Sequence, residues 1–208
     1  MGISQWYQRK LRSITRTFTK VCISRLSNLY KRDKTQVSFA QDEDINVAFT
    51  IIADFKDKYI KIYDKFAEKT VRTFVNKTES NADKTVAKSI ENMNSEELKV
   101  KRNIQSPEID YTIEAIVSEN LSLIKSIPEE FFKKLTFSMS QAIQNGQTLT
   151  EFKKQLMKIK GMTERRATLI ARDQSNKAYN AISRRKLQAC GVKQFEWIHT
   201  GIAKTPRP

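Results

Sequence analysis

The sequence is poor in residues that bind metals or form disulfides. Its 208 residues contain two cysteines and one histidine. Cys22 and Cys190 lie far apart and form no CxxC pair, so we interpret them as small apolar side chains in a reducing compartment, with a disulfide between them as the lesser alternative. His199 has no cysteine or histidine neighbour at zinc-binding spacing. The sequence therefore predicts neither a metal site nor a cofactor.

Motifs for nucleotide binding and nucleophilic catalysis are also missing. The chain contains no GxxxxGKS/T, GxGxxG or GxSxG pattern. Its acidic pairs, Glu96-Glu97 and Glu129-Glu130, are adjacent residues, and adjacent side chains on a helix point about 100° apart. Because such pairs do not converge easily on one substrate, we expect no enzymatic activity.

Glycine, proline and long apolar runs are scarce as well. Five glycines and four prolines are too few for a turn-rich all-β chain. No apolar run reaches the roughly 18–20 residues of a membrane span, and the N-terminus lacks the features of a secretory signal. Hydrophobic residues make up 39% and charged residues 29% of the chain. This composition favours an elongated, mainly α protein.

Positive charge is concentrated at both ends of the chain. The formal net charge is +15. Residues 1–32 carry eight Lys or Arg and no acidic residue, and residues 145–208 carry fourteen Lys or Arg against four acidic residues. The middle of the chain is near neutral. Such ends favour contact with a polyanion or an acidic protein over a simple role in solubility.

Residues 1–34 are expected to form the first part of the protein, a basic amphipathic helix. Within 4–31, apolar residues recur at alternating spacings of four and three, as on one face of a helix. These residues are Tyr7, Leu11, Ile14, Phe18 and Val21. A helix of this kind suits a nucleic-acid arm, a partner-binding helix or a membrane-surface element.

Residues 35–105 are expected to form a second part, built on a long helix and a linker. Over 44–76 an apolar stripe recurs at near-heptad spacing, and a weak break at 76–81 separates this helix from a short one near 86–93. The stripe is more typical of a buried face than of a base-stacking platform, and it is also the candidate for docking on a partner. Its docking candidates are Phe49, Ile52, Tyr59, Ile62 and Phe66.

Residues 106–208 are expected to form the third part, with four successive helices. Ser106-Pro107 is typical of a helix start. Capping boxes at 126–129 and 148–151 predict two further starts, while Gly146 and Gly161 predict two ends. The last helix would begin at Thr163 as its N-cap and end before Gly191.

The last helix and the segment after it carry three further patterns. Small residues form a helix face on which another backbone packs closely. Arg172, Asn176 and Asn180 succeed one another at intervals of four and form either a solvated face or a polar network. After Gly191, the alternation of Phe195 and Trp197 with polar residues predicts a short strand, and hence a small C-terminal α+β part.

The C-terminal half contains, in this order, Ala167, Ile170-Ala171-Arg172-Asp173-Gln174, Asn180, Arg184, Gly191-Val192, Trp197 and Arg207-Pro208. With this ordered combination it resembles the minor head protein family of tailed bacteriophages, also called phage head morphogenesis or Mu F-like proteins. The resemblance covers residues 107–208 and includes the segments 123–132 and 146–149. Members usually continue past an Arg-Pro with a histidine, whereas this sequence stops at Pro208. The structural motif residues are Ala171, Arg172, Asp173, Asn180, Gly191, Trp197 and Arg207.

The resemblance implies a non-enzymatic minor capsid protein, present in several copies per particle, that acts in head assembly or DNA delivery. It implies a place in the capsid interior or at the portal vertex of the virion, and in the host cytoplasm during assembly. The implied partners are the portal protein, packaged double-stranded DNA, and the major capsid or scaffold protein. The basic ends would contact DNA phosphates. The candidates are Arg9, Arg12, Arg16, Lys20, Arg165, Arg166, Arg184 and Arg185.

Two other functions stay open. Gly161-Met162 between two helices is loosely similar to a helix-hairpin-helix, which would make the chain a nucleic-acid-binding module of a mobile element. Alternatively, the helix over 4–31 would be a membrane-active element that aids DNA transfer.

Overall fold

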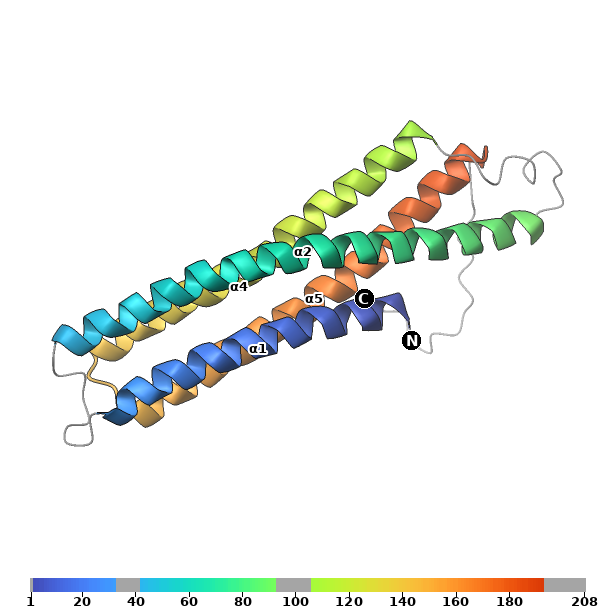
Figure 1. The fold of residues 1–208 in the computed structure, drawn as a ribbon. Helices are drawn as coiled ribbons and strands as arrows, with labels where there is room; N and C mark the ends of the chain where they lie inside the picture. Colours follow the sequence, from blue (N-terminus) through green and yellow to red (C-terminus); the bar gives the residue numbers. More distant parts are fainter. Residues whose placement is uncertain (1, 33–41, 93–105, 193–208) are drawn as a thin grey trace, which may run out of the picture.

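The computed structural model describes residues 2–32, 42–92 and 106–192, and it consists of four long helices in an elongated bundle (Figure 1). The helices are α1 (Ile3–Arg32), α2 (Asp42–Asn92), α4 (Pro107–Gln144) and α5 (Leu149–Ala189). These ranges contain no strand, which confirms the mainly α fold. The strand expected around Phe195 and Trp197 lies outside the described residues.

The helices pack in two layers that share one core. α1 lies along α5 and α2 along the second half of α4, while the start of α4 diverges from α2 (Figure 1). The main hydrophobic cluster draws side chains from all four helices. A smaller cluster joins the last turns of α2 and α5, where Val86 and Ile90 pack near Cys190. The division of the chain into three parts stays a prediction, but α1 shares its core with the C-terminal half.

Aromatic side chains form the centre of this core. Phe18 of α1 lies against Tyr63 of α2 and Phe131 of α4, with ring centroids 5.2 and 4.9 Å apart, respectively. Both contacts are edge-to-face, a geometry that aromatic pairs favour. At the other end of α1, the ring of Tyr7 stacks on Phe74 at 4.1 Å. The apolar face expected in α1 is therefore the face that anchors it.

Several helix ends expected from the sequence are present. α4 begins at Pro107 after an extended Ser106 and ends before Gly146, whose φ of +57° suits glycine. Thr148 caps α5 in the expected capping box, because its side chain accepts a hydrogen bond from the Glu151 amide while the Glu151 carboxylate accepts one from the Thr148 amide. Gly191, with a φ of 96°, lies just after the end of α5.

Two expected breaks were wrong in the middle of the chain. α2 runs through 76–81 without interruption because Thr78 and Ala82 lie on its buried face, and the Thr78 hydroxyl donates to the Phe74 carbonyl. α4 runs through 126–129 although Pro128 removes one backbone hydrogen bond. The Ser126 hydroxyl donates backward to the Leu123 carbonyl instead of capping a new helix. Burial of one continuous face outweighs these local signals.

The break at Gly161 was also wrong. α5 continues through it, and Thr163 is a buried mid-helix residue whose hydroxyl donates to the Ile159 carbonyl. The third part therefore contains two long helices rather than four short ones over 106–192. A helix-hairpin-helix needs a turn at Gly161, so this interpretation is wrong as well.

Alkaline pH is expected to destabilise the bundle. Burial raises the pKa of Tyr7 and Tyr63 above 10.0, their ordinary value. Burial alone lowers the pKa of Lys186, but hydrogen bonds and charge from Asp83 and Glu79 raise it further than burial lowers it. Each group holds its proton more tightly in the folded state, so its stabilisation is complete below the ordinary pKa and is lost as pH rises toward the folded pKa.

The free energy of unfolding, measured with urea by circular dichroism, should therefore stay nearly constant up to about pH 10 and fall steadily from there to about pH 12. Tyr63→Phe removes one of the titrating groups, so its curve should fall less steeply than that of the wild type. A stability that stays constant across this range would contradict the expected linkage.

Candidate nucleic-acid interface

The exposed face of α1 carries a stripe of positive charge. Five of the exposed cations of α1, which we call the α1 stripe, are Arg9, Lys10, Arg12, Arg16 and Lys20. They are exposed because the opposite face of the helix, with Tyr7, Leu11 and Phe18, is buried in the core. At 1.5 Å per residue, the stripe spans roughly 16 Å. The described part of α1 has no acidic residue to offset it.

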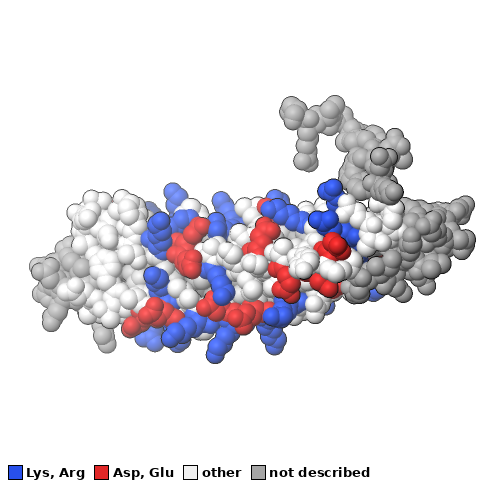
Figure 2. All heavy atoms as spheres, turned by 90° about the horizontal axis from the view of Figure 1, so that it is seen from above, with Lys and Arg blue, Asp and Glu red and all other residues white. Residues whose placement is uncertain are grey.

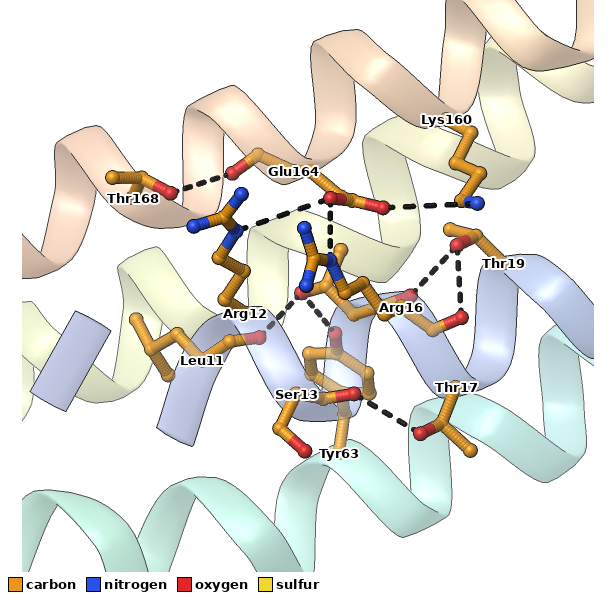
Figure 3. A network of polar contacts seen from close by, with 11 residues as sticks. Leu11, Arg12, Ser13, Arg16, Thr17, Thr19, Tyr63, Lys160, Glu164 and Thr168 are labelled. Atoms are coloured by element: carbon orange, nitrogen blue, oxygen red, sulfur yellow. Dashed lines mark hydrogen bonds and ion pairs between the residues drawn. The ribbon is translucent and has the colours of Figure 1, made fainter. Parts of the chain in front are cut away.

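One carboxylate of α5 organises the middle of the stripe. Figure 3 shows Arg12, Arg16 and Lys160 converging on Glu164. The Glu164 carboxylate accepts a hydrogen bond from the Arg16 guanidinium at 2.8 Å and lies 4.0 Å from that of Arg12 and 3.9 Å from the Lys160 ammonium. Three cations around one anion leave a local net charge of about +2. Glu164 thus holds the arginines in place without neutralising them.

Buried hydroxyl groups fix α1 beneath this cluster. The Thr15 hydroxyl donates to the Leu11 carbonyl at 2.7 Å and shares a 2.8 Å hydrogen bond with the Tyr63 hydroxyl of α2. One turn further, the Thr19 hydroxyl donates to the Thr15 carbonyl at 2.8 Å. These bonds satisfy polar groups that would otherwise be costly to bury. The bond between Thr15 and Tyr63 crosses to α2 and helps to hold α1 in the rotation in which the α1 stripe faces outward.

A shallow surface hollow accompanies the stripe. It measures about 690 Å³ and is lined by Trp6, Arg9, Lys10, Arg12, Ser13, Arg16 and Thr17. The Trp6 ring also receives the Lys77 ammonium at 5.7 Å from its centroid, a cation–π distance. An open hollow with arginine and hydroxyl donors suits an extended anion better than an enclosed small molecule.

Most of the other predicted phosphate contacts lie away from the α1 stripe. Arg165 is the exception: it is exposed on the outer side of α5 and lines one surface hollow together with Arg12. Arg166 instead pairs with Glu130 of α4 at 2.8 Å and donates to Ser126, so its role is to join α5 to α4. Arg184 and Arg185 are exposed near the far end of α5. The eight candidates therefore form several separate groups.

The apolar stripe of α2 faces mostly inward. Ile52 and Tyr59 are buried in the core, and Phe49 and Phe66 are partly buried against it. Ile62 is 40% exposed. This supports the interpretation of the stripe as a buried face. A partner docking here would meet mainly Ile62 and the edges of Phe49 and Phe66.

The residues of the C-terminal motif have different surroundings. Ala171 is buried in the core, while Arg172, Asp173 and Asn180 are exposed, and the guanidinium of Arg172 lies 3.6 Å from Asp173. Asn176 is exposed too, which favours a solvated face for this stripe. Trp197 and Arg207 lie outside the described residues.

Sequence reasoning missed a polar network at the junction of α1, α4 and α5. The Tyr7 hydroxyl donates to the Asn120 side chain at 2.9 Å, and the Asn120 amide donates to Gln174 at 3.0 Å and to the Ile116 carbonyl at 2.8 Å. Gln174 donates in turn to Glu119. The available signal was the position of Asn120, four residues from both Ile116 and Ile124 on an apolar face.

A second missed group ties α5 to α2. The Lys186 ammonium, largely buried, binds Glu79 at 3.2 Å and also contacts Asp83. In the sequence, Lys186 follows Arg184 and Arg185 near the end of a helix, where cations are favourable without any ion pair. Its pairing with two carboxylates removes it from the charge available to a ligand.

Charge is distributed unevenly over the rest of the surface. On the face seen in Figure 2, Lys and Arg alternate with Asp and Glu along the middle, and the described residues visible toward the end where α4 ends show no charged side chain. Within the ranges that the structure describes, no three His, Cys, Asp or Glu residues are placed to hold a metal ion, and no helix has the length and hydropathy of a membrane span.

Comparison with known proteins shows a family match for the C-terminal segment. Residues 133–207 match the family described as Phage Mu protein F like protein, which confirms the resemblance over that segment. The chain is also similar to an uncharacterized protein of Haemophilus influenzae, with 27% identity over 198 residues. This alignment covers 92% of the chain but 42% of the relative, so the chain spans less than half the relative's length. No solved structure matches the chain.

Proposed function

We propose that the chain is a non-enzymatic head morphogenesis protein of a tailed phage or phage-like particle, and that the α1 stripe contacts packaged DNA. The family match over 133–207 supports the first half of the proposal. The second half rests on one observation: five cations lie on one outward face of α1, and Glu164 of α5 holds two of them, Arg12 and Arg16. Contact with the portal protein is proposed from the family match alone.

The contact would be made to the phosphate backbone. Arginine guanidinium groups give charge-assisted hydrogen bonds to phosphate oxygens, and Lys20 adds a point charge. The side chains of the stripe lie on the flank of a helix held against the bundle, so they reach the surface of a duplex rather than its base edges. Binding of this kind is independent of sequence and weakens as salt increases.

The membrane alternative is less well supported. A helix that binds a membrane surface inserts its apolar face into the lipid. In α1 that face, including Leu11 and Phe18, lies in the shared core. Membrane binding would therefore require α1 to leave the bundle, whereas DNA binding uses the face that already points outward.

Replacing Arg9, Arg12, Arg16 and Lys20 together by glutamine should weaken binding to random-sequence duplex DNA. Each phosphate contact contributes about 0.9 to the slope of log affinity against log salt, so the slope should decrease in magnitude by about 3 to 4. Fluorescence anisotropy between about 50 and about 200 mM salt measures both quantities. Circular dichroism shows whether the variant keeps its helices.

The matched control replaces Lys56, Lys61, Lys65 and Arg72 by glutamine. These residues are exposed on α2, and the control changes net charge by the same amount. It should keep most of the wild-type affinity and slope. An equal loss in both variants would mean that bulk charge drives binding, and no wild-type binding at low salt would remove DNA from the proposal while leaving the family match intact.

A further inference from the structure

The outer side of α5 presents large apolar side chains between basic ones. Met157, Met162 and Leu169 are 55%, 37% and 49% exposed, respectively. Lys158 and Arg165 are exposed among them at helical spacings of three and four. We call these five residues the α5 ridge. A helix in a bundle normally turns such a stripe toward a neighbour, and in the described chain no helix covers it.

The ridge also allows close approach. Beside it lies a hollow of about 610 Å³, whose lining includes Met157, Gly161 and Leu169 together with Arg12 of α1. A Cβ added at Gly161 would meet nothing within 4 Å. Methionine side chains adapt to the shape of a partner. The site therefore suits a helix that brings small residues and negative charge.

The first half of α4 has the complementary character. Residues 107–122 contain four acidic residues and no Lys or Arg. Tyr111 is 75% exposed. The exposed small residues on the same side of the helix, at spacings of four, three and four, are Ala115, Ser118 and Ser122. We call this set the α4 face, together with Asp110 and Glu114, which form no ion pair with another described residue.

We propose that the α4 face of one copy docks on the α5 ridge of a second copy. The two surfaces match in length, at roughly 16 Å from Tyr111 to Ser122 and roughly 18 Å from Met157 to Leu169. They match in charge, since Asp110 and Glu114 would meet basic residues of the ridge such as Arg165. They also match in size, because small side chains on one helix admit the large ones of the other.

The two surfaces do not meet within one chain. The α4 face lies at the end of the bundle where α4 diverges. The α5 ridge lies in the first half of α5, toward the other end of the bundle (Figure 1). Because each copy offers both surfaces, the contact is heterologous and adds copies head to tail into rings or open chains. The α1 stripe, apart from Arg12, stays uncovered in such an assembly.

Sedimentation velocity of the full chain tests the proposal. The wild type should associate increasingly from micromolar to millimolar concentration. Leu169→Glu on the ridge and Tyr111→Ala on the α4 face should each weaken association about tenfold or more, since a large exposed anchor is lost. Phe137→Glu is the matched control: Phe137 is 63% exposed on α4 outside both surfaces, and its replacement should leave association unchanged. A wild type that stays monomeric overturns the proposal, as do variants that associate like the wild type.

Mixing the two variants gives a sharper test. Leu169→Glu copies keep an intact α4 face and Tyr111→Ala copies keep an intact α5 ridge, so an equimolar mixture should form dimers and stop there. A charge exchange adds an independent check, because Glu114→Arg and Arg165→Glu should each weaken association and the double variant should restore it. The proposal is overturned if the mixture remains monomeric, or if the double variant associates more weakly than either single variant.

Discussion

Replacing Phe18 with alanine should lower the free energy of unfolding by about 3–5 kcal/mol. The ring is fully buried and meets Tyr63 of α2 and both Phe131 and Phe132 of α4, with centroids 4.9 to 6.1 Å apart. Its removal loses the transfer free energy of the ring and leaves a cavity that three helices border. Because a domain of this kind is stable by roughly 5–15 kcal/mol, the loss is a large fraction of the total.

Urea unfolding followed by far-UV circular dichroism measures this change. Phe137→Ala is the matched control, since it removes the same ring from a site that is 63% exposed. Its effect should stay within about 0.5 kcal/mol. Equal effects of the two substitutions would mean that α1 does not share its core with α2 and α4 in solution.

Replacing Asn120 with leucine should cost about 3 kcal/mol, although leucine has a similar size. The substitution leaves the Tyr7 hydroxyl and the side-chain oxygen of Gln174 without a partner in a buried place. Each unsatisfied buried group costs about 1–3 kcal/mol. The expected loss therefore comes from the groups left behind rather than from Asn120 itself.

A double-mutant cycle with Tyr7→Phe tests that explanation. In the wild type, Tyr7→Phe should cost about 1 kcal/mol because it breaks the bond to Asn120. In the Asn120→Leu background it should cost nothing or stabilise, because the hydroxyl no longer has a partner. Asn176→Leu, an exposed site on α5, is the control and should be near neutral. Additive effects in the cycle would contradict the network.

Both predictions bear on the candidate interface, because the core and the network hold α1 in place. Tyr7 and Phe18 lie on the face of α1 opposite the stripe. A variant that loosens α1 should therefore weaken DNA binding together with stability. A substitution in the α1 stripe itself should weaken DNA binding with little change in stability.

Periodicity and end signals predicted much of the fold. The spacing of Leu11 and Phe18 predicted α1 and its buried face, and the Thr148 capping box predicted the start of α5. The helix breaks predicted at Gly161 and at Ser126-Pro128 were wrong, because these residues lower helix stability locally without ending a helix. A cost of about 1 kcal/mol for glycine or 3 kcal/mol for proline is smaller than the gain from burying one uninterrupted face of four helices.

The candidate interface was only partly predictable. The sequence named Arg9, Arg12, Arg16 and Lys20 because a helix without acidic residues shows its basic side directly in its spacing. It did not predict the pairing of Arg16 with Glu164, which lies 148 positions away. Nor did it show that Arg166 pairs with Glu130 and so differs from the other candidate phosphate contacts. Pairing across helices depends on which helices become neighbours, and local patterns do not contain that information.

By itself, the sequence determined that the chain is helical, that α1 has an apolar and a basic side, and that its C-terminal segment is similar to the Mu F-like family. The tertiary structure decided that α1 lies along α5, that Asn120 and Lys186 are polar anchors, and which cations remain available to a ligand. The physical reason is that helix formation depends on neighbours within a few residues, whereas burial and ion pairing depend on residues brought together only by packing.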